Sequence, residues 1–295
     1  MLTIGSLFSG IGGLEMGLEQ AGLGPVLFQA ENNDYAQKVL RKHWPNAIHY
    51  WDVRTVCSRI HPDFCPGYVD ILCGGPPCVG FSRAGAQGGL DDPRSGLWSE
   101  YIRIVRYLVP RYVVFENVAQ IQTLHEGQHF KTVVDDLASS GYATAWWRDT
   151  ALAAGAPHLR ERVWLVGWHV GNTDLEGLAG RRLPRSERPD GVAAGSSGRT
   201  GTVGSTRSVE SGLRRDARGN SYRPHEDRWP ALRGQQQHAW EPPRTTLEGR
   251  GRRDRLTALG NIAMPVNARV AGELILQLED RRLKGVAPWT HRTND

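Results

Sequence analysis

The sequence predicts an α/β protein whose mostly parallel sheet carries helices on both faces, accompanied by a small irregular region. Three observations predict this class. Short apolar runs alternate with segments of helical periodicity along most of the chain, which is typical of strand–helix–strand units. A glycine-rich loop follows the first run, and a turn of two glycines and two prolines follows a later one. Open sheets of this class place their chemistry at the carboxyl ends of the strands.

The N-terminal elements follow from local patterns. Residues 3–7 predict a buried strand, and residues 8–13 form a tight glycine loop. A helix is expected next, because Leu14 and Leu18 recur on one face and Gly22 favours its end. A second strand and a second helix are expected at residues 26–31 and 35–43, and a short third strand is expected to end near residues 51–52.

The same alternation continues towards the C-terminus. Residues 69–73 predict the strand that precedes the proline turn, and the helical spacing of apolar residues predicts an amphipathic helix within 97–108. A β-rich run at 111–115 ends in Glu116 and Asn117. A helix over 127–139, strands over 143–150 and 163–166, and a last helix over 265–283 complete the expected elements.

Basic charge is concentrated in one segment. Residues 171–255 contain 17 arginines, no lysine and 11 acidic residues, a net charge of +6, whereas the rest of the chain has 19 basic and 20 acidic side chains. The segment is rich in glycine, proline and serine and lacks strand or helix periodicity. Two interpretations stay open: a solvated, partly disordered insert, or a phosphate-binding surface, since arginine suits phosphate oxygens and guanine edges.

Membrane proteins and metal sites are not expected. The first residues lack the basic start of a signal peptide, and no stretch approaches the roughly 20 apolar residues that span a bilayer. The cysteines form no C-x-x-C pair, which argues against a zinc or iron–sulfur site. Reduced thiols in this composition fit a cytoplasmic protein. The four cysteines are Cys57, Cys65, Cys73 and Cys78, spaced 8, 8 and 5 residues apart.

The glycine loop after the first strand indicates a nucleotide-type ligand. Glycine backbone can approach a ligand closely, and the following helix start favours negative charge. Gly10 and Gly12 fit a dinucleotide fingerprint, but Glu15 stands where its third glycine should be. Glu31 ends the second strand about twenty residues further on, where a carboxylate can bind ribose hydroxyls. The loop alone favours an adenosyl-type cofactor, nicotinamide or otherwise.

Cys78 follows Gly74, Gly75, Pro76 and Pro77 directly at the end of a strand-like run. Each proline fixes its φ angle, so the chain leaves the strand along a stiff path that presents the thiol at the edge of the sheet. For a lone cysteine, a buried structural role would be the simpler interpretation. The glycine-rich stretch that follows it, together with the other motifs, favours a reactive thiol instead.

Taken together, the motifs resemble those of the cytosine-C5 DNA methyltransferase family over residues 3–169 and 254–283, in order and spacing. The loop Phe8-Ser9-Gly10-Ile11-Gly12-Gly13 resembles the family's first motif, Glu31 its second and Asp52 its third. Gly75-Pro76-Pro77-Cys78 resembles the catalytic motif and Glu116-Asn117-Val118 the acid motif. Arg160-Glu161-Arg162 resembles the arginine pair, and the stretch from Arg255 to Gly260-Asn261 resembles the last motifs.

The resemblance implies a Rossmann-like methyltransferase sheet and a covalent mechanism. The Cys78 thiolate would attack carbon 6 of cytosine, which makes carbon 5 nucleophilic enough to take a methyl group. Glu116 would act as the acid at ring N3, Arg162 would hold the exocyclic O2, and Arg160 would fix the acid or a phosphate. We expect Asn117 to brace the proline–cysteine loop.

The resemblance also implies the ligands. S-adenosylmethionine would be the methyl donor. Phe8 would stack on its adenine, and Glu31 would bind its ribose hydroxyls. The other expected cofactor-binding residues are Gly10, Gly12, Asp52, Pro76, Leu97 and Asn261. Double-stranded DNA would be the partner, its cytosine flipped out of the helix, with Ser82 and Arg83 contacting phosphates.

The expected organisation is a catalytic domain at 1–169, an arginine-rich and partly disordered target-recognition region at 170–253, a return to the catalytic domain at 254–283 and a tail at 284–295. We expect a monomer in the cytoplasm of a bacterial cell or a phage-infected host, with a possible restriction endonuclease acting separately. Three alternatives stay open: an RNA cytosine-C5 methyltransferase, a catalytically inactive DNA-binding relative, and a nicotinamide oxidoreductase, which the missing third glycine disfavours.

Overall fold

A computed structural model describes residues 1–56, 65–77, 96–152, 159–171 and 251–285, together with 181–182, 214–215, 221–222 and 236. The expected recognition region therefore lies almost entirely outside the described residues, as do Cys78, Ser82 and Arg83. None of the helices in these ranges is long and apolar enough to cross a membrane.

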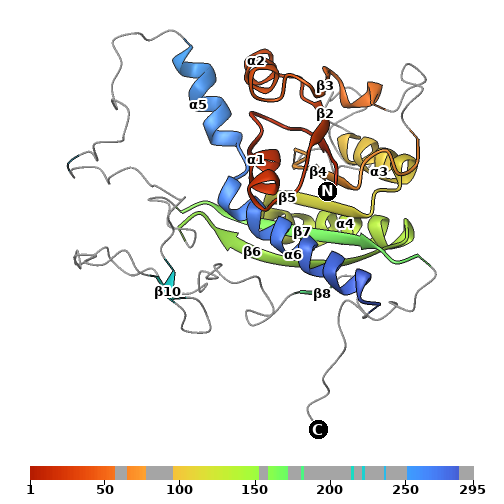
Figure 1. The fold of residues 1–295 in the computed structure, drawn as a ribbon. Helices are drawn as coiled ribbons and strands as arrows, with labels where there is room; N and C mark the ends of the chain where they lie inside the picture. Colours follow the sequence, from red (N-terminus) through yellow and green to blue (C-terminus); the bar gives the residue numbers. More distant parts are fainter. Residues whose placement is uncertain are drawn as a thin grey trace.

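The core of the molecule is one twisted sheet (Figure 1). Its strand order is β3-β2-β1-β4-β5-β7-β6-β8, and β1 to β5 run parallel. The strands are β1 (Ile4–Leu7), β2 (Val26–Ala30), β3 (Ile48–Tyr50), β4 (Ile71–Gly74), β5 (Tyr112–Val118), β6 (Tyr142–Thr150), β7 (Glu161–His169) and the short β8 (Arg181–Arg182). A separate antiparallel pair joins β9 (Arg214–Arg215) and β10 (Ser221–Tyr222).

Strand β7 departs from the expected parallel arrangement. It lies between β5 and β6 and runs antiparallel to both. Residues 151–160 link β6 to β7, and this link is too short for the crossover of a dozen or more residues that parallel neighbours need. The Ala151 amide donates to the Arg160 carbonyl oxygen at 3.0 Å, so the pairing continues one residue beyond the facing ends of β6 and β7.

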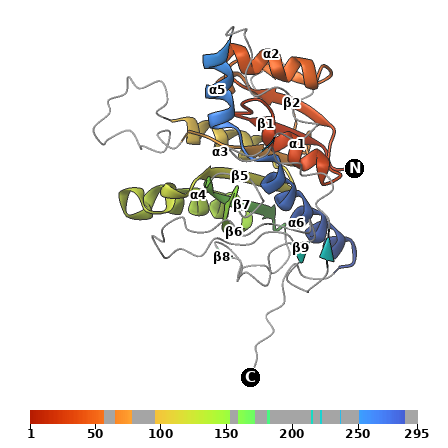
Figure 2. The ribbon, with the colours of Figure 1, turned by 90° about the vertical axis from the view of Figure 1, so that its left-hand side faces the viewer.

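Helices cover both faces of the sheet, as the sequence predicts (Figures 1 and 2). Helices α1 and α6 share one buried apolar cluster with the sheet, and α3 and α4 share the other. The helices are α1 (Gly13–Gln20), α2 (Asp34–His43), α3 (Leu97–Leu108), α4 (Gln128–Ser139), α5 (Arg252–Asn261) and α6 (Pro265–Leu283). Short 3-10 turns lie at Val53–Thr55, Ala119–Gln122 and Leu124–Gly127. All expected strands and helices within the described ranges are present, while α5 was not expected as a separate helix.

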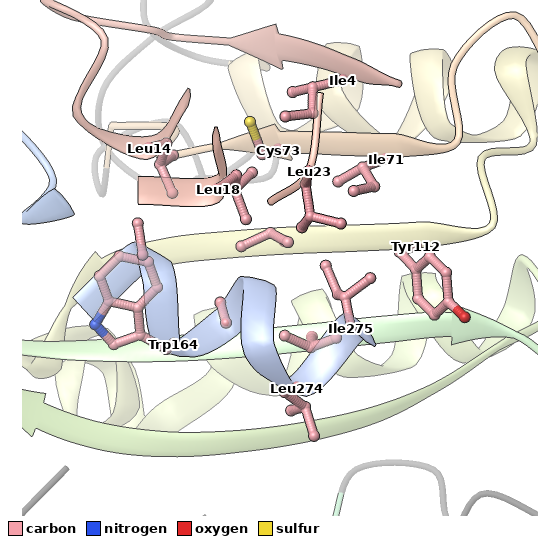
Figure 3. Packing of buried hydrophobic residues seen from close by; sticks show 14 of the residues in the cluster. Ile4, Leu14, Leu18, Leu23, Ile71, Cys73, Tyr112, Trp164, Leu274 and Ile275 are labelled. Carbon is pink, nitrogen blue, oxygen red and sulfur yellow. The ribbon is translucent and has the colours of Figure 1, made fainter. Parts of the chain in front are cut away.

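Glycines let α6 pack tightly on α1. A Cβ atom at Gly13 would collide with the Ala263 carbonyl, and one at Gly17 with Pro265 and Ala268. Figure 3 shows the resulting apolar layer, in which Leu274 and Ile275 of α6 lie over the sheet together with side chains of α1. This packing brings the segment that precedes α6 to the loop between β1 and α1.

Candidate functional site

The carboxyl ends of the parallel strands surround two adjoining cavities of about 370 and 340 Å³. The first is lined by the glycine loop, by the ends of β5 and α5, and by two arginines: Arg162 on β7 and Arg160 directly before it. The second lies over the ends of β2 and β3. Phe8, Glu31, Asn32 and Pro77 line both cavities, so these four residues form the boundary between them.

The glycine loop shapes this boundary through an unusual backbone. Phe8 and Gly10 both have φ near +56°, a left-handed conformation that costs a non-glycine residue energy. Between them, the Ser9 amide donates to the Ala30 carbonyl oxygen at 3.1 Å. Gly12 caps α1 at φ +90°, and a Cβ there would collide with the Trp44 ring. Phe8 and Gly10 therefore border a cavity, whereas Gly12 serves the packing of Trp44 beneath the loop.

Glu31 is held by backbone amides. Its Oε2 accepts from the Gly10 amide at 2.7 Å and its Oε1 from the Asn33 amide at 2.9 Å. Burial raises the pKa of the carboxyl, and these hydrogen bonds partly offset that rise. Gln37 fixes the strand ends behind it by donating to the carbonyl oxygens of Glu31 and Tyr50. The carboxylate is thus oriented at the boundary between the two cavities, where its oxygens can accept further hydrogen bonds from hydroxyl groups.

The second cavity contains two of the four remaining predicted cofactor residues. Asp52 and Leu97 line it, and Asp52 also accepts from the Arg54 amide at 2.9 Å. Trp51, which is not among the predicted site residues, lines it too and is 52% exposed. The sequence signal for Trp51 was its position, because a large aromatic residue stands directly before the predicted Asp52 at the end of a strand. This cavity offers an aromatic wall and two carboxylates, which suits an adenosine.

The first cavity contains a buried carboxyl beside two arginines. Glu116 near the end of β5 is 8% exposed, and its Oε1 lies 3.1 Å from Nε of Arg162 on β7. Burial raises the pKa of Glu116, and the charges of Arg162 and Arg160 act in the opposite direction. Gly75 leaves room for this carboxyl, since a Cβ there would approach Oε2 to 2.9 Å. The antiparallel insertion of β7 is what brings Arg162 to Glu116.

Asn117 braces the proline turn, as expected. Its Nδ2 donates to the Pro76 carbonyl oxygen at 2.8 Å, and its side chain is buried. Pro76 and Pro77 line the first cavity, so the chain that continues into Cys78 leaves from the cavity wall. The predicted nucleophile and the predicted DNA contacts Ser82 and Arg83 lie outside the described residues. Their roles stay predictions.

Arg160 has two backbone partners that the sequence did not predict. Its two terminal nitrogens donate to the carbonyl oxygens of Gly260 and Ile262 at 2.6 and 2.7 Å, at the end of α5. It influences Glu116 through its charge, and this arrangement ties the C-terminal segment to the acid. Asn261, a predicted cofactor residue, lines the first cavity, as do Thr257 and Ala258, which are not among the predicted site residues.

Comparison with known proteins agrees with this geometry. The family model described as C-5 cytosine-specific DNA methylase matches residues 2–245. The chain is 33% identical over 170 residues to the Type II methyltransferase M.Bsp6I of Bacillus sp., covering 57% of this chain and 52% of that one. It is 31% identical over 180 residues to the Type II methyltransferase M.AquIA of Picosynechococcus sp., covering 57% and 72%.

The fold also resembles a solved structure. A DNMT2 triple mutant of Spodoptera frugiperda superimposes with a TM-score of 0.50 at 22% identity, covering 63% of this chain and 55% of that one. The chain spans about half the length of the first of the curated relatives above. Helices α5 and α6 follow the matched residues and are placed beside the site by their packing on α1 and by Arg160. Since the family model matches more than half of the sequence, the chain belongs to the C-5 cytosine-specific DNA methylase family.

Proposed function

We propose that the protein transfers a methyl group from S-adenosylmethionine to carbon 5 of cytosine in double-stranded DNA. One observation carries this proposal: an adenosine-sized cavity and a buried acid with two arginines share the wall from which the chain runs into Cys78. The residues of the second cavity fit the cofactor, because Phe8 offers an aromatic face, Glu31 and Asp52 offer acceptors, and Leu97 offers an apolar surface.

Each residue then has a defined chemical role. The Cys78 thiolate forms a bond to carbon 6 of the cytosine, and the electrons of the C5–C6 double bond move to carbon 5. Glu116 donates or shares a proton at ring N3, and Arg162 stabilises the developing charge at O2. When bound, S-adenosylmethionine would supply the methyl group, which bonds to carbon 5 as S-adenosylhomocysteine leaves. The C5 proton is then removed by a base, the S–C6 bond breaks, and Cys78 is released.

The proposal extends to DNA recognition, oligomeric state and location in the cell. Residues 170–253 would form the target-recognition region, with Ser82 and Arg83 contacting phosphates from the loop after Cys78. Two of the relatives are named Type II methyltransferases. We also propose that the protein acts as a monomer, beside a separate restriction endonuclease, in the cytoplasm of a bacterial cell or a phage-infected host.

Covalent trapping tests the proposal. Duplex DNA containing 5-fluorocytosine should form a stable adduct with the wild type when S-adenosylmethionine is present, because fluorine cannot leave as the C5 proton does. Cys78→Ala should abolish the adduct and methyl transfer while still binding S-adenosylhomocysteine in calorimetry. Cys65→Ala is the matched control, since this thiol is exposed and lies outside the two cavities, and it should react like the wild type.

Two results would contradict the proposal. Methylation of DNA without an adduct would exclude Cys78 as the nucleophile. Bisulfite sequencing of both DNA and RNA shows which of the two polymers is methylated. Conversion-resistant cytosines in RNA but not in duplex DNA would identify RNA as the substrate.

A further inference from the structure

Glu15 is a fully buried carboxyl group that the proposed mechanism does not use. It lies in the first turn of α1 and is 0% exposed. Its Oε1 accepts from Gln29 Nε2 of β2 at 3.0 Å. Ser6 of β1 and Ser9 of the glycine loop also contribute hydrogen bonding to this carboxyl. Glu15 therefore links helix α1, strands β1 and β2 and the glycine loop at one point.

Burying a carboxyl in this place is costly, which calls for a compensating role. Burial raises the pKa of Glu15, and the neighbouring Ser6, Gln29 and Ser9 offset only part of that rise. Its Oε2 has no well-aligned partner among the residues that the structure describes. Cys73 of β4, fully buried on the same side, has its pKa raised by burial and further by this carboxyl. An apolar side chain here would avoid these costs.

The hydrogen bonds around Glu15 continue through Ser6 and Ser9 to the loop that lines the two cavities. Ser9 Oγ donates to Ser6 Oγ at 2.9 Å, and the Ser9 backbone binds both the Ala30 carbonyl and the Gly12 amide. Ser9 lies between Phe8 and Gly10, whose left-handed backbone shapes the boundary between the cavities. A strained conformation at Phe8 persists only where surrounding contacts fix it. The hydrogen bonds around Ser9 are contacts of that kind.

Glu15 also explains why the third glycine of a dinucleotide fingerprint is missing. In that fingerprint the third glycine permits close packing of the helix on the strand. In this protein the close contacts of α1 are made instead to α6, by Gly13 and Gly17. The side of α1 that faces the sheet is free to hold a polar side chain, and Glu15 occupies it.

We propose that Glu15 is a positioning residue which, through Ser6 and Ser9, holds residues 8–12 in the conformation that binds the cofactor. The identity of the cofactor rests on the proposed function, but the effect on the loop does not. Glu15 touches neither the cofactor cavities nor the acid, so its contribution is to affinity and not to the chemical step.

Three variants test this proposal. Glu15→Leu has a similar volume and no polar atoms, so it leaves Gln29 and Ser6 without their acceptor and removes the anchor of the Ser9–Ser6 hydrogen bond. Glu15→Gln keeps the shape and one acceptor oxygen and should act as the conservative rescue. Leu18→Ala is the control for lost stability, because Leu18 is equally buried one turn along α1 and packs towards Gly272 of α6.

The first measurement is hydrogen exchange at the amides of Ser9, Gly10 and Gly12, whose acceptors are known. The second is the Kd for S-adenosylhomocysteine by calorimetry, with kcat at saturating cofactor. Glu15→Leu should speed exchange and raise Kd, each by about 10-fold, a change typical of one or two lost hydrogen bonds, while kcat stays within about 3-fold. Glu15→Gln and Leu18→Ala should stay within about 3-fold of the wild type in both measurements, although Leu18→Ala lowers Tm.

Wild-type exchange in Glu15→Leu would overturn the proposal, as would equally fast exchange in Leu18→Ala. If the wild-type protein does not bind S-adenosylhomocysteine, the proposed function fails, but the exchange rates still decide whether Glu15 holds the loop. A fall in kcat with unchanged Kd would also contradict a positioning role towards the cofactor.

Discussion

On the cofactor side of the site, Glu31 accepts hydrogen bonds from backbone amides, whereas on the acid side Glu116 faces two arginines. Glu31 and its partners come from loops at the ends of neighbouring strands, within a short stretch of sequence. Glu116 meets Arg162 across the antiparallel β5–β7 pair, and Arg160 reaches the end of α5 about a hundred residues later.

This difference shows how one residue type acquires two roles. Burial raises the pKa of both carboxyls. The amides around Glu31 fix its orientation without adding a full charge, which suits the recognition of neutral hydroxyls. The arginines around Glu116 compete with burial, so the carboxyl can hold or give up a proton as the charge on a substrate changes.

The largest expected effect comes from the acid side. Glu116→Gln cannot donate a carboxyl proton, so kcat should fall by about 10²–10⁴-fold, while the Kd for S-adenosylhomocysteine stays close to that of the wild type. In the wild type the acid works only while it is protonated, so its contribution should be lost as the pH rises through its raised pKa. Single-turnover methylation across a pH series measures both effects.

Glu100→Gln is the control for this change, because Glu100 pairs with Arg103 on α3 and lines neither cavity. It should keep the wild-type rate. A Glu116→Gln protein that loses cofactor affinity instead of rate would show that the two sides of the site are not separate.

The cofactor side should show the opposite pattern. Glu31→Ala removes a carboxylate that is oriented towards the cavities and should weaken S-adenosylhomocysteine binding by about 1–3 kcal/mol. At saturating S-adenosylmethionine, kcat should change little, because Glu31 does not touch the reacting atoms. Calorimetry and steady-state kinetics on the same sample measure the two quantities. Binding of NADH without any response to S-adenosylhomocysteine would revive the oxidoreductase alternative.

The last expected effect, on stability and not on rate or cofactor binding, concerns the packing that joins the two sides. Gly17→Ala places a methyl group against Pro265 and Ala268 and should lower the free energy of unfolding by about 1–3 kcal/mol. Gly260→Ala is the matched change, because a Cβ there meets nothing within 4 Å and alanine favours the helix. It should leave stability unchanged or slightly higher. Equal Tm values for both variants would contradict the close packing of α1 on α6.

Much of the fold could be predicted from local patterns. The strands and helices within the described ranges follow from apolar periodicity, and Glu31, Asp52 and Glu116 were placed at or near strand ends before any contact was known. Parallel strands bring their carboxyl ends to one edge, so local assignment was sufficient to predict that these residues gather there. The motif order then supplied the family resemblance.

The sequence by itself determined which residues lie at that edge, because periodicity and turn chemistry act within a few residues of the chain. Only the tertiary structure decided their partners. The antiparallel insertion of β7 pairs Arg162 with Glu116, the packing of α6 brings Gly260 and Ile262 to Arg160, and the fold buries Glu15 beneath the glycine loop. These outcomes depend on contacts between distant segments and on the loss of water around charged groups, and neither leaves a local pattern in the sequence.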